Sequence, residues 1–373
     1  MKTVNGVYTS AKIFTDTIED YALAQIQMLC DNEAFAGCTV RIMPDVHPGK
    51  VGTIGFTSTV GKRVLPNVVG IDVGCGVTLG KLKQKKTEFG KLDKVIREKV
   101  PCGFGVRKKS HRFNQEFDFL QLHCVEHVNI EKAELSLGTL GGGNHFLELD
   151  QDEDGNLYAV VHSGSRRLGK EVTEYYLTEG QKELKKRGIS VSYEMTYLEG
   201  ALMEEYLQDI QAVQEFAKLN RYAILDELAK GMKWKIQEQI TSVHNYIDDT
   251  GDNMILRKGA ISAGEEEPVI IPINMRDGIL LGVGKGNADW NYSAPHGAGR
   301  KMKREEVKTR YTVSQFKTEM KGIYSSCIGK DTLDEAPFAY RNLKEIEGQI
   351  GDTVEIRKRL KPIYNFKAGT GKS

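Results

Sequence analysis

The segment Val68-Val69-Gly70-Ile71-Asp72-Val73-Gly74-Cys75-Gly76-Val77 joins an apolar run to a glycine-rich turn. Residues 68–71 have the apolar, β-branched character of a strand, and the glycines after them allow the backbone to approach a neighbour closely. Asp72 and Cys75 lie three residues apart on this turn. Both side chains bind metals when ionised, and a thiolate can bridge two ions, although a turn aspartate beside a buried cysteine is a simpler alternative.

Glycine turns of this kind recur along the chain. Of its 373 residues, 39 are glycine, which exceeds the roughly 7% of an average protein. Sixteen of them lie in five clusters, at 70–80, 138–143, 164–169, 278–286 and 297–299. Clustered glycine marks tight turns, so the pattern predicts a site assembled from many loops.

Between the glycine turns, strand and helix signals follow one another without regular alternation. Apolar β-branched runs predict strands at 38–42, 51–60, 67–71, 146–148, 157–161, 254–257, 268–273 and 279–283, and extended or mixed structure at 353–360 and 362–366. Helical spacing predicts helices at 19–29, 81–100, 113–135, 196–231, 233–243, 313–320 and 336–346. We therefore expect a single irregular mixed α+β domain over residues 1–373.

Composition narrows the class of protein. Hydrophobic residues make up 40% and charged residues 28%, as in a globular protein, and the net charge of +1 offers no global basic field for nucleic acid. No run approaches 18 apolar residues, and the first 16 residues lack a signal-peptide pattern. The six cysteines contain no Cys-x-x-Cys pair. These features predict a cytoplasmic protein without a membrane partner.

Three histidines extend the ligand set begun by Asp72 and Cys75. His145 follows three glycines, His162 ends the predicted strand 157–161, and His244 follows a predicted helix. Taken singly, they are also explained as a turn, a strand-end and a core histidine. Together, the five side chains offer N, O and S donors for two divalent ions, a set that suits Mn²⁺ or Zn²⁺ better than Ca²⁺ or Mg²⁺.

A fourth histidine, His296, stands in the string Ser293 to Lys301. Small residues flank it, so a phosphorus centre can approach its ring, and histidine can act as a covalent nucleophile. Arg166, Arg300 and Lys285 lie in neighbouring motifs and can neutralise phosphate. Basic runs at 81–86, 107–112, 300–310 and 357–361 make an RNA-backbone track plausible. A glycine loop with an exposed histidine, and solvated charged helix faces, are the simpler alternatives.

The chain resembles the RtcB family of RNA ligases. The matching strings, which occur in the family's order together with Lys367, are 43–50, 70–76, 140–149, 162–169, 244–246 and 296–300. The resemblance implies an α+β domain with its metal site in a central cleft. It implies GTP- and Mn²⁺-dependent joining of RNA 2′,3′-cyclic phosphate or 3′-phosphate ends to 5′-hydroxyl ends, in RNA repair or tRNA splicing, and it leaves open whether an activating protein is needed.

The resemblance also implies a role for each matching residue. Two Mn²⁺ ions per subunit are expected on Asp72, Cys75, His145, His162 and His244, with Cys75 bridging. His296 is expected to attack the α-phosphate of GTP and to form a His–GMP phosphoramidate. The expected nucleotide contacts are Asn144, Glu148, His296, Gly297, Ala298, Gly299, Tyr340 and Lys367. The expected RNA or phosphate contacts are Arg166, Arg300 and Lys285.

Two other functions fit the same residues. A two-metal phosphodiesterase or phosphatase acting on RNA ends would use the metal ligands without His296. A non-catalytic protein that binds guanine nucleotide or RNA ends would keep the pocket without turnover. The chain is shorter than the usual family member, and its segment 282–292 differs from the serine-bearing stretch of longer members.

Overall fold

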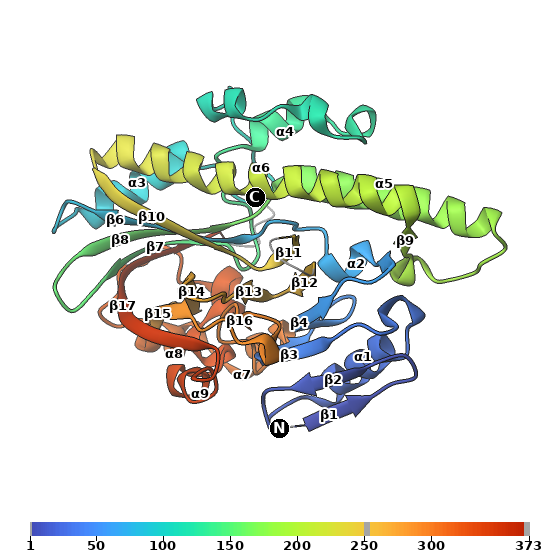
Figure 1. Cartoon of the computed structure of the whole chain (residues 1–373). Helices are drawn as coiled ribbons and strands as arrows, with labels where there is room; N and C mark the ends of the chain where they lie inside the picture. Colours follow the sequence, from blue (N-terminus) through green and yellow to red (C-terminus); the bar gives the residue numbers. More distant parts are fainter. Residues whose placement is uncertain (1, 250–253, 369–373) are drawn as a thin grey trace.

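The computed structural model describes residues 2–249 and 254–368 (Figure 1). Within these ranges the strands form two large sheets and two small ones. In spatial order, the six-stranded sheet contains β1 (Lys2–Asn5), β2 (Ser10–Ile13), β3 (Val40–Pro48), β4 (Thr53–Thr59), β12 (Ile255–Lys258) and β11 (Asn245–Asp248). Its neighbours pair antiparallel, except that β2 runs parallel to β3.

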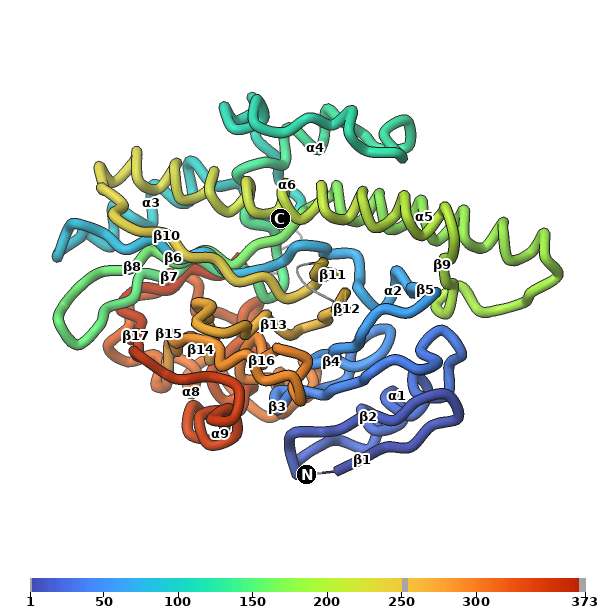
Figure 2. The backbone as a smooth tube through the Cα atoms, viewed as in Figure 1, coloured from blue at the N-terminus to red at the C-terminus, as the bar shows by residue number. Residues whose placement is uncertain are grey.

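The seven-stranded sheet is antiparallel throughout. Its order is β10 (Ile236–Val243), β6 (Gly76–Leu82), β8 (Leu157–Ser163), β7 (Phe146–Gln151), β17 (Val354–Lys367), β15 (Gly278–Gly284) and β14 (Pro268–Asn274). The small sheets pair β13 (Ala260–Ser262) with β16 (Ser293–Pro295) and β5 (Arg63–Val64) with β9 (Leu198–Glu199). Figure 2 shows β17 curving between β7 and β15.

The helices are α1 (Asp20–Cys30), α2 (Pro66–Val69), α3 (Phe89–Lys99), α4 (Ile130–Ser136), α5 (Arg166–Lys186), α6 (Gly200–Met232), α7 (Arg304–Arg310), α8 (Val313–Glu319) and α9 (Leu343–Glu347). Helices α5 and α6 run along the top of the view, with α4 beyond them, away from the sheets (Figure 1). No helix within 2–249 or 254–368, the 33-residue α6 included, is long and apolar enough to cross a membrane.

Helix α6 and the strands beneath it form the framework that carries the site. The helix packs against β6, β8, α3 and α5. All seven residues of β8 are buried, because both faces of the strand are covered. Val161 packs in one cluster with Leu225 of α6, and Val160 packs in another with Ile270 of β14. Strand β8 therefore presents His162 from a rigid, enclosed position.

Most of the predicted elements are confirmed, and with them the mixed α+β fold. Predicted helix 196–231 is the single helix α6, and 19–29 and 313–320 correspond to α1 and α8. The other predictions that hold, within a few residues, are strands 38–42, 51–60, 146–148, 157–161, 254–257, 268–273 and 279–283. Segments 353–360 and 362–366 form one long strand, β17.

Two predictions, one before β6 and one after α6, were wrong in type. Residues 67–71 belong mainly to the short helix α2, because Pro66 occupies its first turn and fixes a helical φ. The segment 233–243 is strand β10 instead of a helix. Lys233 adopts a left-handed conformation (φ +57°) that ends α6, and the β-branched residues beyond it pair with β6.

Three predicted helices are shorter than expected, and one long helix was missed. Residues 113–135 contain only short 3₁₀ turns and most of α4. The side chains of His111, Asp118 and Asn129 each cap the N-terminus of a new short helix, so no long helix forms. The segment 336–346 holds a 3₁₀ turn and the start of α9, and 81–100 begins in β6 before α3. Helix α5 was missed because its sequence contains interior glycines.

Helix α6 also fixes the two loops that carry predicted metal ligands. Arg221 is fully buried, and its guanidinium donates to the carbonyl oxygens of Gly74 (2.7 Å) and Ser163 (3.0 Å). The buried Asn220 amide donates to the carbonyl of Gly164 at 3.0 Å. The turn before β6 and the turn after β8 are thus held against the same helix.

We predict that Arg221→Met lowers the free energy of unfolding by about 3 kcal/mol, since it leaves buried carbonyls unsatisfied at about 1–3 kcal/mol each. Urea denaturation followed by circular dichroism measures the change. Gln211→Ala, at an exposed position of α6, is the control and is expected to change stability by less than about 0.5 kcal/mol. A loss below about 1 kcal/mol in Arg221→Met would contradict the anchoring role.

Candidate metal and nucleotide site

The five predicted metal ligands converge at one point in the structure. The Sγ atom of Cys75 lies 3.4 Å from Nε2 of both His145 and His162. Nε2 of His145 lies 3.1 Å from Oδ2 of Asp72, and Nε2 of His162 lies 3.4 Å from Nε2 of His244. The donor atoms form two triads, each within 4.8 Å, and Cys75 belongs to both. This is the arrangement that a bridging thiolate requires.

The turn from Asp72 to Cys75 is packed so closely that glycine is needed around it. Gly74 has φ +74°, and a Cβ there would lie 2.8 Å from Ala217 and Gln214 of α6. A Cβ on Gly164, just after β8, would lie 2.1 Å from the Asp72 carboxylate. Glycine at both positions lets the helix and the second turn press against the ligand-bearing turn.

The three histidines enter the cluster from three places in the fold. His145 directly precedes β7, His162 lies within β8, and His244 joins β10 to β11. Nδ1 of His145 donates to the carbonyl of Leu140 at 2.8 Å, which turns Nε2 of the ring towards Asp72 and Cys75. The short Nε2 contacts place one nitrogen of each ring at the shared centre.

The electrostatics of the cluster fit a divalent cation. Burial opposes ionisation of Asp72, but His145 and Arg166 outweigh it and lower the pKa of Asp72 to about 2. Burial, with the Asp72 charge, raises the pKa of the Cys75 thiol well above its ordinary value. Burial also lowers the pKa of the His162 and His244 rings, so both are neutral. The thiol can then ionise only beside a cation.

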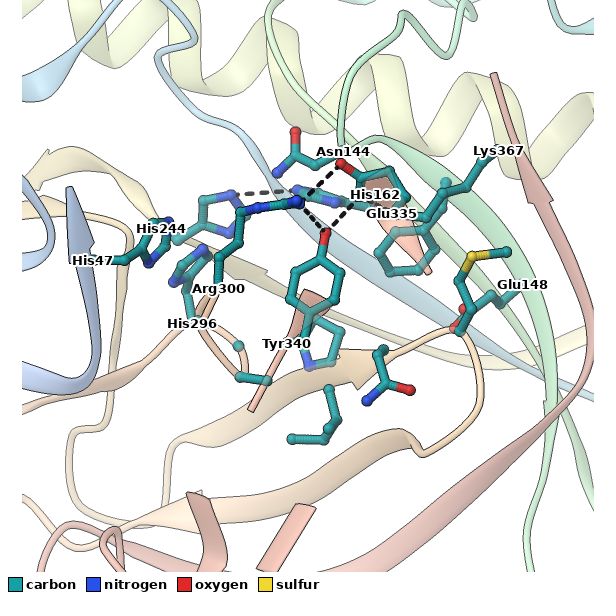
Figure 3. Close-up of a pocket in the computed structure, with 18 of the residues that line it drawn as sticks. His47, Asn144, Glu148, His162, His244, His296, Arg300, Glu335, Tyr340 and Lys367 are labelled. Carbon is teal, nitrogen blue, oxygen red and sulfur yellow. Dashed lines mark hydrogen bonds and ion pairs between the residues drawn. The ribbon is translucent and has the colours of Figure 1, made fainter. Parts of the chain in front are cut away.

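A pocket of about 780 Å³, its open mouth included, opens beside the triad of Cys75, His162 and His244 (Figure 3). All of the predicted nucleotide contacts line it: Asn144, Glu148, His296, Gly297, Ala298, Gly299, Tyr340 and Lys367. Arg300 and His47 line it as well.

His296 is oriented by a carboxylate that the sequence did not predict. Its Nδ1 lies 2.7 Å from Oδ2 of Asp45, a fully buried residue of β3, and its ring centroid lies 4.8 Å from that of His244. An imidazole that donates from Nδ1 to a carboxylate keeps its lone pair on Nε2. Asp45 lies in the string 43–50. A carboxylate within a largely apolar strand is the sequence signal that could have identified it as a site residue.

Glu335 is a second unpredicted residue, at the centre of a buried charge cluster. Its carboxylate accepts hydrogen bonds from Lys367 (2.6 Å), Tyr340 (2.5 Å) and Arg300 (3.3 Å), and it also contacts Arg304. Burial disfavours its charge, but Lys367, Arg304 and Arg300 outweigh that effect and lower the pKa of Glu335 to about 2. The dashed lines in Figure 3 mark part of this network. Glu335 thereby fixes the positions of the pocket's polar groups.

Glu148 reaches the pocket from β7, where the side chain of Asn365 donates to it from β17. Burial raises the pKa of Glu148 to about 7 despite the nearby charge of Lys367. A carboxyl group that is partly ionised near neutral pH can accept hydrogen bonds from a ligand N–H group.

Two predicted phosphate contacts lie outside this pocket. Arg166 begins α5, and its guanidinium donates to the carbonyl of Gly103 at 2.9 Å, on the Asp72 side of the cluster. Lys285 follows β15 and donates to the carbonyl of Gly351. The structure therefore does not bring Lys285 to the pocket, and its phosphate contact stays a prediction.

A family model matches most of the chain. The model of the RtcB family, described as tRNA-splicing ligase RtcB, matches residues 32–368. The chain belongs to the RtcB family. The matched range contains the positions of every predicted metal ligand, of His296, and of the unpredicted Asp45 and Glu335.

Curated RtcB proteins align with nearly the full chain. RNA-splicing ligase RtcB of Escherichia coli K12 is 29% identical over 371 residues, which covers 88% of this chain and 90% of that protein. tRNA-splicing ligase RtcB of Nanoarchaeum equitans is 27% identical, with 91% and 90% covered. That second alignment extends over 428 residues, more than this chain contains, so the relative carries insertions that this chain lacks.

We predict that Cys75→Ala reduces bound Mn²⁺ from about two ions per chain to less than one, because both triads lose the shared donor. Metal content after equilibrium dialysis, measured by mass spectrometry, tests this. Cys38→Ala removes a buried thiol outside the triads and is expected to keep the native stoichiometry. Retention of both ions in Cys75→Ala would show that the thiol does not bridge them.

We predict that Glu335 makes stability depend on pH. Its folded pKa of about 2 lies below an unfolded value of about 4.3. Its contribution is therefore present above a pH of about 4.3 and is lost as the pH falls towards the folded pKa. Relative to Glu335→Gln, the native chain should be more stable by on the order of 3 kcal/mol at about pH 6, and this difference should shrink towards about pH 3.

Urea unfolding at about pH 3, 4, 5 and 6 measures that difference across the titration range. Glu153→Gln, in an exposed turn, is the matched control and should change stability by less than about 0.5 kcal/mol throughout. A stability difference between the native chain and Glu335→Gln that is the same at every pH would contradict the assignment.

Proposed function

We propose that this chain is an RNA ligase that uses GTP and Mn²⁺ to join an RNA 2′,3′-cyclic phosphate or 3′-phosphate end to a 5′-hydroxyl end. The observation that carries the proposal is the position of His296, held by Asp45 beside the triad of Cys75, His162 and His244. The names of the relatives, RNA- and tRNA-splicing ligases, support the same reaction.

His296 is the proposed nucleophile. Its Nε2 lone pair attacks the α-phosphorus of GTP, an N–P bond forms, and the bond to the bridging oxygen of pyrophosphate breaks. The ring becomes positively charged as the bond forms. Asp45, 2.7 Å from Nδ1, holds the Nδ1 proton and stabilises that charge.

The pocket residues hold the nucleotide in this scheme. Arg300 supplies positive charge for phosphate oxygens, and Tyr340, Lys367 and Glu148 contact the guanine base. Two Mn²⁺ ions, held by Asp72, Cys75, His145, His162 and His244, would neutralise phosphate charge and stabilise the charge that develops at phosphorus.

The later steps transfer and then release GMP. A cyclic phosphate end is first hydrolysed to a 3′-phosphate. An oxygen of that 3′-phosphate attacks the phosphorus of the His296-bound GMP, which breaks the N–P bond and restores the neutral ring. The 5′-hydroxyl oxygen of the second RNA then attacks the 3′-phosphate, forms the phosphodiester and expels GMP. We further propose that the whole chain is one catalytic domain acting in the cytoplasm, in RNA repair or tRNA splicing.

Labelling with α-³²P-GTP and Mn²⁺ tests the nucleophile. We expect acid-labile label on the native chain, none on His296→Ala, and a rate reduced about 10-fold or more in Asp45→Asn, which loses the carboxylate that orients the ring. His127→Ala, an exposed histidine, is the control and should label normally. Label that persists in His296→Ala would sink this assignment.

Joining of a 3′-phosphate RNA to a 5′-hydroxyl RNA, followed on a denaturing gel, separates the three functions. A ligase gives the joined product only with GTP. Release of phosphate or opening of a cyclic end, without labelling or joining, would instead identify a hydrolase. Nucleotide binding without any of these reactions would identify a binding protein.

A further inference from the structure

A second groove lies on the Arg166 side of the metal cluster. It is lined by the loop 103–106, the glycines at 142 and 143, residues of α4 and the first turn of α5. Its volume, about 1520 Å³ with its open mouth, is about twice the 780 Å³ of the nucleotide pocket. The groove is therefore the larger of the two openings.

Positive charge dominates this groove. Lys132 of α4 and Arg166, Arg167 and Lys170 of α5 line it, and no carboxylate is among the described residues that do so. The first turn of α5 contains no acidic residue. Arg167 and Lys170 pair with Glu171 and Glu174 one turn further along α5. Their cations nevertheless oppose the helix dipole at the N-terminus of α5. Their position favours a polyanionic ligand.

An aromatic ring stands fully in solvent at the same place. Phe104 is 103% exposed, and Val106 beside it is 44% exposed. Glycines flank Phe104 on both sides, so neither adjacent residue has a side chain that could cover the ring. An exposed flat ring among cations is the combination that binds single-stranded nucleic acid, where bases stack on aromatics and phosphates contact cations.

Arg166 connects the groove to the metal cluster. Its Nη2 donates to the carbonyl of Gly103, and its Nε donates to Oγ1 of Thr139 at 3.2 Å. A Cβ on Gly141 would lie 1.8 Å from Nη1 of Arg166 and 2.8 Å from Nδ1 of His145. The guanidinium therefore sits next to a ligand ring while still lining the groove. Its backbone keeps a φ of +58°, a conformation that a non-glycine residue rarely adopts.

We propose that this groove binds the single-stranded end of the RNA substrate, with a base stacked on Phe104 and phosphates on Lys132, Arg167 and Lys170. The inference rests on the proposed ligase function and names where its RNA lies. A single strand is favoured over a duplex because paired bases hide the faces that Phe104 would contact. The groove and the nucleotide pocket meet at residues 142–144, since Asn144 lines the pocket.

Fluorescence anisotropy with a single-stranded RNA of about 12 nucleotides that ends in a 3′-phosphate tests the base contact. We expect Phe104→Ala to raise the Kd at least about 5-fold, as for loss of one stacked base, and Phe104→Trp to restore binding. Tyr21→Ala, which removes an exposed ring from α1 (60% exposed), is the matched control. A fully paired RNA of the same length should bind native and Phe104→Ala chains equally.

The salt dependence of the same Kd tests the phosphate contacts. Lys132→Gln and Lys170→Gln should each lower the slope of log Kd against log salt concentration by about 0.7. Lys185→Gln, exposed at the far end of α5, should leave the slope unchanged. If the native chain joins RNA ends but these variants bind as it does, the groove assignment is wrong and the ligase stands. A native chain that joins no ends refutes the proposed function instead.

Discussion

The thiol of Cys75 sets the geometry of the whole site, because it must lie within 3.4 Å of two imidazoles that arrive from different strands. That contact requires the turn before β6, the start of β7 and the end of β8 to meet at one height in the sheet. The pairing of β8 with both β6 and β7 supplies the register. The buried guanidinium of Arg221, which bonds the turns before β6 and after β8, keeps them there.

The pocket beside His296 depends on buried carboxylates that pair with its cations and with the His296 ring. Lys367 is 6% exposed, and Arg300 lines the same pocket. Both positive charges therefore need a negatively charged partner in the protein when no ligand is bound. Glu335 is that partner, and it holds each cation at a fixed place. Asp45 does the same for His296. The polar groups of the pocket are thus positioned by buried carboxylates, and a ligand meets a preformed surface.

The sequence reveals the donors of this site better than the residues that position them. Cys75 stands out because it lies in a glycine-rich turn, and His162 stands out because it ends a predicted strand. Asp45 and Glu335 do not stand out in this way. Each carboxylate acts through a partner that the fold brings to it from far along the chain: His296, 251 residues from Asp45, and Lys367, 32 residues from Glu335. Strand β10 also depends on a distant partner. Its sequence does not distinguish a helix from a strand, and pairing with β6 makes it a strand.

Residues 142–144 lie where two openings meet. One is the pocket beside His296, the proposed nucleotide site, and the other is the basic groove beside Arg166. In the proposed reaction the nucleotide and the RNA strand would therefore reach the metal cluster from opposite sides of residues 142–144. Pyrophosphate would then leave on the side of His296, away from the strand in the basic groove.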